Sequence, residues 1–268
     1  MKTILPFLKW PGGKRWFVAS HSHLLPRTFN RYIEPFLGGG SVFFHLKPAR
    51  SLLSDLNPEL IATYAAIRDG WSGLSEKLIS HQAHHGKEYY YSVRASKPRL
   101  PVTKAARMIY LNRTCFNGIY RVNLEGKFNV PKGTRDTVVL ETDDFEGAAA
   151  LLANAELHTS DFEVVIDQAQ EADLIFADPP YTVRHNVNGF LKYNEQLFSW
   201  DDQVRLADAL ARARDRGAQI VLTNANHDSV RCLYQERRFA LTEVSRYSSI
   251  SAETQSRKQF EELVIRSF

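Results

Sequence analysis

Cysteine is scarce in this chain of 268 residues, which contains only Cys115 and Cys232. A disulfide framework is therefore not expected, and no Cys/His cluster has the spacing of a zinc site. The histidine pairs His21/His23 and His84/His85 have the chemistry to bind a metal, but solvated loop histidines are the simpler interpretation. We predict no metal site and a reducing, intracellular environment.

Long apolar runs are also missing, so no segment has the length of a transmembrane helix. Pro6, Trp10 and Pro11 interrupt the N-terminus, which lacks the pattern of a signal peptide. Hydrophobic residues still make up 44% of the chain, enough for a core, and this argues against disorder. We expect a soluble, cytoplasmic protein without a membrane partner, built as one large α/β domain or as a domain with a sizeable insertion.

Positive charge is concentrated in one segment. Residues 87–135 contain eleven Lys or Arg residues against Glu88 and Glu125, a net charge of +9, whereas the whole chain carries +4. The remainder is therefore net negative. Such a local basic excess is typical of a nucleic-acid-binding surface.

The stretch from Asp173 to Tyr181 reads Asp-Leu-Ile-Phe-Ala-Asp-Pro-Pro-Tyr, a short apolar run that ends in a carboxylate, two prolines and an aromatic. The run predicts a strand buried on both faces, which must stop at Asp178 because proline cannot donate ladder hydrogen bonds. Ligands gather at the carboxyl ends of strands in open α/β sheets. A carboxylate, two prolines and an aromatic side chain together could bind an exocyclic amino group on a planar heterocycle. The alternative is a strand end with a helix-capping Asp and a packing Tyr.

A glycine-rich turn follows an earlier predicted strand. Residues 31–36 are expected to form that strand, and Leu-Gly-Gly-Gly-Ser at 37–41 to open a helix. A second strand at 51–54 ends in Asp55, at the distance where an acidic residue binds a ribose in dinucleotide-binding folds. The G-x-G-x-x-G spacing is absent. A nucleoside-bearing cofactor is therefore predicted without its identity, and an ordinary helix-opening turn is the alternative.

The N-terminal stretch Phe7–Lys14 holds a Pro-Gly-Gly turn that allows backbone to approach a ligand closely. A nucleotide-binding P-loop is not expected, because Arg15 stands where that motif has Ser or Thr.

Strand and helix alternate up to a helix predicted over 58–68, after which the alternation breaks. Residues 70–140 hold the basic excess and a helix-like stretch at 102–111, and predict an inserted, mostly helical subdomain. Asn117-Gly118 predicts a hairpin turn, followed by a second turn at 124–127. Hairpins that carry Arg and Asn can read guanine and adenine edges in a DNA groove.

The remaining chain predicts a return to strands and helices. Asp143 is a candidate helix cap. Residues 160–162 are expected to lie at the edge of the bound cofactor, and residues 182–198 to form a polar lid beside the site. A helix should open at Asp201 and Asp202 and stop at Gly217, with its arginines on a solvated face. Further strands are expected around 156–158 and over 218–223, 240–246 and 260–266.

These motifs, in this order, resemble the Dam-type (D12 class, α group) DNA N6-adenine methyltransferases. Asp178–Tyr181 resembles motif IV, residues 36–40 and 54–60 resemble motifs I and II, and the N-terminal stretch and residues 111–131 resemble the cofactor-contacting and target-recognition motifs. Residues 248–251 and 261–263 also resemble the family's C-terminal end. The resemblance implies a Rossmann-like class I methyltransferase sheet with a helical DNA-recognition insertion that carries a β-hairpin. It implies a catalytic domain of residues 1–69 and 141–268 and a target-recognition subdomain of residues 70–140.

The resemblance also implies roles for individual residues. The catalytic residues are Asp178, Pro179, Pro180 and Tyr181. S-adenosyl-L-methionine would be bound by Trp10, Gly12, Lys14, Glu34, Phe36, Gly38, Gly40, Asp55, Asp161, Phe162 and Asp178. DNA would be bound by Lys9, Arg113, Asn117, Ile119, Arg121, Asn129, Pro131, Lys132 and Arg135.

The implied reaction is methyl transfer to N6 of an adenine that leaves the helix, with Asp178 and the Pro179 carbonyl accepting its N–H bonds and Tyr181 stacking on it. The expected substrate is double-stranded DNA at GATC or a related site, although Ile119 and Arg135 depart from one common form of the recognition pattern. A monomer, with or without a companion restriction endonuclease, is expected. The rivals are a catalytically silent DNA-binding regulator and an RNA or cytosine-N4 methyltransferase.

Overall fold

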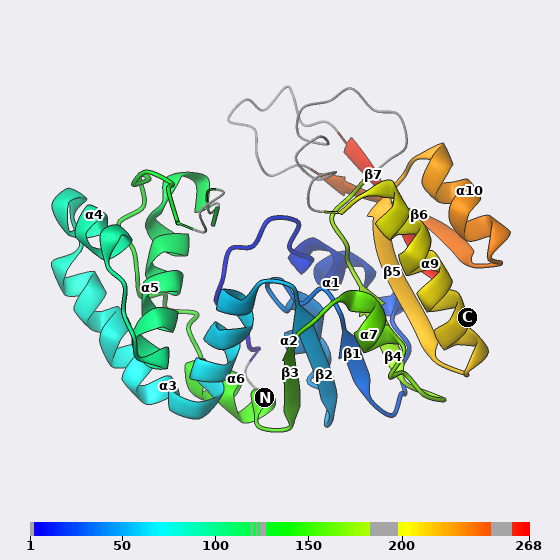
Figure 1. Ribbon diagram of the computed structural model, residues 1–268, viewed down its shortest axis with the longest axis horizontal. Coiled ribbons are helices and arrows are strands. Elements are labelled where there is room, and N and C mark those ends of the chain that lie inside the picture. Colours follow the sequence, from blue (N-terminus) through cyan, green and yellow to red (C-terminus); the bar gives the residue numbers. More distant parts are fainter. Residues whose placement is uncertain (1–2, 119, 122, 124–126, 183–197, 248–258) are drawn as a thin grey trace. The chain divides into compact units, whose positions relative to one another are not determined.

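The computed structural model describes residues 3–118, 120–121, 123, 127–182, 198–247 and 259–268 (Figure 1). Most of the lid predicted at 182–198, and the stretch 248–251, lie outside the described residues. No helix in the described ranges is both long enough and apolar enough to span a bilayer. In the same part of the chain, no three His, Cys, Asp or Glu side chains gather as metal ligands would.

The fold is α/β, as predicted, with seven strands in one mostly parallel sheet (Figure 1). The strands are β1 (Tyr32–Glu34), β2 (Ser51–Asp55), β3 (Ala155–Thr159), β4 (Leu174–Ala177), β5 (Gln219–Ala225), β6 (Ala240–Tyr247) and β7 (Gln259–Arg266). Their order is β3-β2-β1-β4-β5-β7-β6. β1 pairs in parallel with β2 and β4, and β4 with β5, whereas β7 runs antiparallel between β5 and β6. This sheet confirms the predicted Rossmann-like architecture.

The register fixes which residues share the carboxyl edge of the parallel strands. Ala177, the last residue of β4, pairs with Leu222 of β5, and Ala225 at the end of β5 pairs with Glu262 of β7. All four residues of β4 are fully buried, as expected for a strand covered on both faces. The chain that leaves β4 at Asp178 therefore emerges near the end of β5 and the start of β7.

The helices bring one correction. They are α1 (Arg15–His21), α2 (Ser41–Leu46), α3 (Pro58–His84), α4 (Lys87–Ala95), α5 (Pro101–Thr114), α6 (Phe145–Leu152), α7 (Phe162–Ile166), α9 (Trp200–Asp215) and α10 (Asp228–Glu236), with 3-10 turns η1 (Ser22–Leu24) and η2 (Phe116–Gly118). The prediction that the first long helix ends near residue 68 is wrong. Gly70 leaves helical geometry at φ −160° and ψ 41°, yet α3 resumes and buries Leu74 and Leu78. The glycine kinks the helix instead of ending it.

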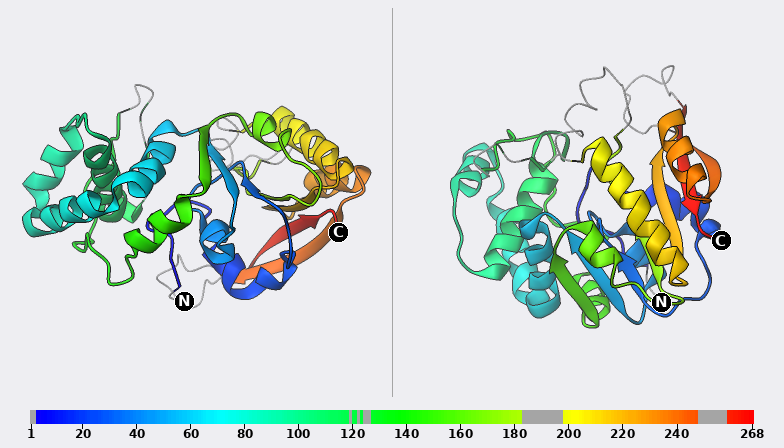
Figure 2. Two further views of the ribbon diagram at one scale, coloured as in Figure 1. Left: turned by 90° about the horizontal axis from the view of Figure 1, so that it is seen from below. Right: turned by 45° about the vertical axis from the view of Figure 1, so that its right-hand side comes forward.

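Two compact units emerge from the packing. The first comprises Met1–Val18, Gly38–Ala49 and Asp55–Thr159, and in it α3 packs along α5 and α6 (Figure 2). The second comprises Ala19–Leu37, Arg50–Ser54 and Ser160–Phe268, and in it α7, α9 and α10 cover β4 and β5 with a core of aliphatic and aromatic side chains. The division of the chain into catalytic and recognition parts remains a functional proposal.

Candidate active site

Asp178 lies where β4 ends, in the second unit. Its Oδ1 accepts a hydrogen bond of 2.8 Å from the Oγ1 of Thr223, a fully buried residue of β5. The two strands are in register over Leu174–Ala177, so the hydroxyl is fixed by the sheet itself. A carboxylate that accepts from a hydroxyl fixed in this way keeps its orientation.

Tyr181, three residues further on, is half-buried, and its hydroxyl donates to Oε2 of Glu262 at 2.5 Å. Burial raises the pKa of Tyr181 well above its usual value, and the negative charges of Asp178 and Glu262 raise it further. The phenol therefore stays protonated at neutral pH and acts as a donor.

A chain of polar residues in the interior anchors the backbone that follows Tyr181. Thr182 donates from Oγ1 to the carbonyl of Phe198 at 2.6 Å. Gln203 donates to the carbonyl of Thr182 at 3.5 Å and accepts at 3.1 Å from the side-chain amide of Asn224. Thr182, Gln203 and Asn224 are buried, so their mutual hydrogen bonds offset the cost of removing them from water. The sequence analysis missed these residues, although the polar pair Thr223-Asn224, which follows the apolar run at 220–222 within β5, was a signal for them.

Three phenylalanines form an aromatic cluster near the end of β1. Phe36 stacks on Phe162 with ring centroids 5.4 Å apart, and Phe198 contacts both rings at 5.7 and 5.6 Å. Phe162 and Phe198 are buried, whereas Phe36 is partly exposed. The cluster offers a flat apolar surface to a planar ligand.

Arg205 and Arg212 lie on the exposed face of α9, as predicted, and Arg205 also organises the neighbouring corner. Its guanidinium lies 4.5 Å from the Phe162 ring centre and pairs with Asp161 at 2.7 Å. Asp161 also caps α7 by accepting from the amide of Glu163. A second α9 arginine, Arg212, bridges to Glu163 at 2.7 Å. The sequence could not reveal these pairs, because α7 and α9 are about forty residues apart.

The glycine turn lies in the first unit and is tied to Asp55. Gly38 adopts φ +47°, and its amide donates to Asp55 Oδ2 at 3.0 Å. Asp55 Oδ1 accepts from the amide of Asn57 at 3.0 Å. Burial raises the pKa of Asp55, and these two amide bonds partly offset that rise. Asn57, not Asp55, caps α3 by accepting from the amides of Glu59 and Leu60.

The residue at position 38 must be small because Trp10 approaches it. A Cβ on Gly38 would lie 2.8 Å from Trp10 Cδ1, closer than real contacts allow. Gly40, at φ +63°, begins α2 in left-handed geometry. Gly12 has φ +76°, and its carbonyl accepts from the buried Lys14 ammonium at 2.8 Å. Gly38 and Gly40 thus adopt backbone conformations that favour glycine, and Trp10 packs directly on the first of them.

Glu34 ends β1 in the second unit and is buried. Burial raises the pKa of Tyr32 well above its usual value, and the negative charge of Glu34 raises it further.

The predicted hairpin is described only in part, since residues 119, 122 and 124–126 lie outside the described residues. Within the described residues, an antiparallel bridge joins Cys115 to Lys132, and the amide of Phe116 donates to the carbonyl of Pro131 at 2.9 Å. Asn117 lies in the η2 turn at φ 57°. Residues 124–126 of the second predicted turn lie outside the described residues, and the residues on either side, Asn123 and Lys127, are joined by two hydrogen bonds of 2.9 Å. Helix α5 continues to Thr114, so the residues expected to begin the hairpin belong to this helix instead.

Lys9 is hydrogen-bonded to this loop. Its ammonium donates to the carbonyl of Asn117 at 2.7 Å, and its backbone exchanges hydrogen bonds of 2.9 and 2.8 Å with the side chain of the buried Asn112. Partial burial and the charge of Arg135 lower the pKa of Lys9. Next to it, Trp10 stacks on Tyr120, whose hydroxyl donates to Glu59 at 2.6 Å. Lys9 therefore lies against Asn117, and Arg135 is near enough for its charge to act on Lys9.

Arg113 does not fit its predicted role as a DNA contact. It is buried, and its guanidinium donates to both carboxylate oxygens of Asp143 at 2.6 and 2.7 Å and to the carbonyls of Phe7 and Val138. All five of its N–H donors are used within the protein. Asp143 is thereby occupied as well, and Asp144, one residue later, caps α6 instead.

The other predicted DNA contacts differ in exposure. Arg121, Asn129 and Pro131 are exposed, whereas the ammonium of Lys132 pairs with Asp136 at 2.7 Å. Ile119 lies outside the described residues.

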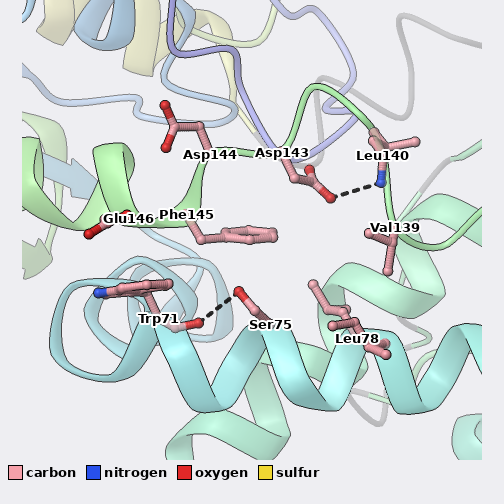
Figure 3. A pocket seen from close by; sticks show the side chains of 10 residues that line it. Trp71, Ser75, Leu78, Val139, Leu140, Asp143, Asp144, Phe145 and Glu146 are labelled. Atoms are coloured by element: carbon pink, nitrogen blue, oxygen red, sulfur yellow. Dashed lines mark hydrogen bonds between the residues drawn. The ribbon is translucent and has the colours of Figure 1, made fainter. Parts of the chain in front are cut away.

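A groove in the first unit contains none of the predicted site residues (Figure 3). It has a volume of about 290 Å³ and lies between α3 and the segment that precedes α6, with Trp71, Leu78, Val139 and Phe145 among its lining residues. The hydroxyl of Ser75 within it donates to the carbonyl of Trp71 at 3.0 Å. Its acidic rim makes it an unsuitable surface for DNA.

Comparison with known proteins gives the chain a family. Residues 10–250 match the model of the D12 class N6 adenine-specific DNA methyltransferases. The chain is 34% identical to the Type II methyltransferase M1.LlaDCHI of Lactococcus lactis subsp. cremoris, over 99% of this chain and 96% of that protein. It is 31% identical to the DNA adenine methylase of Haemophilus influenzae, over 97% and 92%, and 29% identical to that of Escherichia coli K12, over 98% and 95%. The chain therefore belongs to the D12 class N6 adenine-specific DNA methyltransferases.

Proposed function

We propose that this adenine-specific DNA methyltransferase uses S-adenosylmethionine to methylate N6 of an adenine flipped out of duplex DNA, at GATC or a closely related site. The observation that carries the proposal is the Asp178 carboxylate, held by Thr223 at the carboxyl edge of β4 with Tyr181 beside it. A buried edge with one oriented acceptor and one aromatic ring suits an amino group on a planar base.

Asp178 and the carbonyl of Pro179 would accept the two N–H bonds of the adenine amino group. The N6 lone pair is delocalised into the ring, and these two acceptors localise it toward the incoming methyl group. The N6–methyl bond forms as the methyl–sulfur bond breaks, and an N6 proton is then lost to water. An in-line approach cannot be reached inside a base pair, so the adenine leaves the stack and Tyr181 packs against it.

The residues present fit S-adenosylmethionine, which supplies an already electrophilic methyl group when bound. In the first unit, the Trp10 ring lies directly against Gly38, and Asp55 offers a carboxylate to a ribose. In the second unit, the partly exposed ring of Phe36 and the Asp161–Phe162 corner suit an adenine ring. We assign a supporting role to four further residues, which would hold the cofactor-binding residues in place through the backbone or through polar contacts: Gly12, Lys14, Glu34 and Gly40.

The loop closed by the Cys115–Lys132 bridge is proposed to read the DNA sequence. Lys9, Asn117 and Arg135 lie together on it or against it, and Arg121 projects from it. Asn129, Pro131, Lys132 and Ile119 are assigned to the same surface, and Arg113 is left out because the fold uses it. A companion restriction endonuclease is also proposed, and the L. lactis relative is named a Type II methyltransferase.

Single-molecule sequencing of DNA from a methylation-free host that expresses the protein tests the proposal. Methylated adenines are expected in one short palindromic site, and none in cells that express Asp178→Ala. Methylation at cytosine N4 would reject the proposal. Unmodified DNA from cells whose expressed protein still binds the cofactor would reject it as well.

A further inference from the structure

Glu262 is a buried carboxylate to which the proposed function assigns no role. It belongs to β7, pairs in register with Ala225 of β5 and Val244 of β6, and is 4% exposed. A carboxylate in such a place costs free energy unless hydrogen-bond donors face it. The hydroxyl of Tyr181, at 2.5 Å, is such a donor.

Hydrogen bonds join two hydroxyls and two carboxylates. Thr223 donates to Asp178 at 2.8 Å and also hydrogen-bonds with Tyr181, and Tyr181 donates to Glu262. A phenol has one proton, so a Tyr181 that donates to Glu262 does not donate to Asp178. The bond also fixes the far end of the ring, while the backbone after Tyr181 is fixed by the Thr182–Phe198 hydrogen bond of 2.6 Å.

We propose that Glu262 is a positioning residue that holds the Tyr181 ring in the orientation that stacks on the target adenine and keeps the phenol proton away from Asp178. This inference rests on the stacking role proposed for Tyr181. Glu262 acts through Tyr181 and does not touch the substrate. Its effect is therefore predicted to vanish when the hydroxyl is absent.

The test uses the full-length protein and a duplex with 2-aminopurine at the target adenine, whose fluorescence reports unstacking and restacking of that base. Glu262→Ala is expected to lower kcat/KM about tenfold to a hundredfold, the effect of losing one charge-assisted hydrogen bond, and to change the 2-aminopurine signal of the complex. Glu262→Gln keeps an acceptor oxygen for the phenol and should recover most of the loss. Glu261→Ala, which removes the exposed neighbouring carboxylate paired with Asn226, is the matched control and should change neither readout.

A double-mutant cycle with Tyr181→Phe decides whether the two residues act together. Tyr181→Phe alone should resemble Glu262→Ala, and adding Glu262→Ala or Glu262→Gln to it should cause no further loss of kcat/KM. Additive losses, or a Glu262→Ala enzyme with wild-type rate and fluorescence, would overturn the proposal. If Glu262→Ala does not fold, the Tyr181→Phe and Tyr181→Phe/Glu262→Gln pair gives the same decision. A wild-type enzyme that leaves adenine unmethylated would instead reject the proposed function.

Discussion

The carboxyl edge around Asp178 and the loop around Asn117 carry the two halves of the proposed activity, yet they are built differently. At the edge, Asp178 and Tyr181 are held by residues of β5 and β7, whose positions follow from strand register. The loop, in the described residues, has an isolated bridge, a 3-10 turn and side-chain bonds from Asn112. Methyl transfer needs a fixed geometry, whereas base reading tolerates adjustment on binding. The difference predicts that edge substitutions change rate and loop substitutions change site choice.

The largest expected effect concerns Arg113, in the helix α5 that precedes the loop. Arg113→Ala should lower the free energy of unfolding by about 3–5 kcal/mol, because it leaves the carboxylate of Asp143 buried without its ion pair. Urea denaturation followed by circular dichroism measures it. Arg99→Ala, at an exposed position of the same basic segment, is the control, with a change within about 0.5 kcal/mol. Removing Asp143 as well should restore part of the loss. Unchanged stability with lost DNA affinity would return Arg113 to the DNA-binding surface.

Arg113 also shows where sequence reasoning stops. The strands at 51–55 and 174–177 could be predicted because apolar runs of strand length end in polar residues. The burial of Arg113 could not, since its partners Phe7 and Asp143 stand 106 and 30 positions away in the chain. In a segment with so much positive charge, a buried arginine is indistinguishable from one that binds phosphate.

The residues that support the active edge were hidden for a related reason. Thr223 and Glu262 approach Asp178 and Tyr181 through the pairing of β4 with β5 and of β5 with β7. Strand order and register in such a sheet depend on long-range packing and not on local pattern. The helix predicted over 58–68 was too short, because Gly70 kinks α3 and helical structure continues to His84.

At the rigid edge, Asp178→Ala should lower kcat about a hundredfold to a thousandfold, the cost of losing one preorganised polar group at a reaction centre. Stability should change little, because the carboxylate is only half-buried and Thr223 loses one acceptor. Single-turnover methylation with thermal unfolding of the same sample measures both. A variant that keeps near-normal methylation would remove Asp178 from the mechanism.

On the glycine turn, Asp55→Ala should weaken S-adenosylmethionine by about 1.5–3 kcal/mol, the usual range for a hydrogen bond to a charged group. Calorimetric titration with the cofactor measures it, and DNA affinity should stay the same. Asn57→Ala is the matched control, since it removes the α3 cap and should cost about 0.5–2 kcal/mol of stability with little change in cofactor affinity. Equal cofactor affinities for wild type and Asp55→Ala would leave Asp55 as a support for Gly38 alone.

The loop gives the smallest and most selective effect, at Arg121. This exposed residue follows Tyr120, which stacks on Trp10 and donates a hydrogen bond to Glu59. An exposed arginine in such a place can contact a base, and a bidentate arginine–guanine pair is the commonest specific contact. Arg121→Ala should cost about 1–3 kcal/mol at one base pair and relax discrimination there. Methylation rates on duplexes substituted at each position of the mapped site measure this.

The matched control for Arg121 is Lys132→Ala, a change at a proposed phosphate contact in the same loop. It should weaken all sequences alike and reduce the slope of log affinity against log salt by about one unit at most. The reduction should fall short of that limit, because Asp136 already pairs with Lys132 at 2.7 Å and neutralises part of its charge. If Arg121→Ala instead lowers every rate equally and leaves base preference unchanged, Arg121 contacts the DNA backbone, and the reading of sequence belongs to another part of the loop.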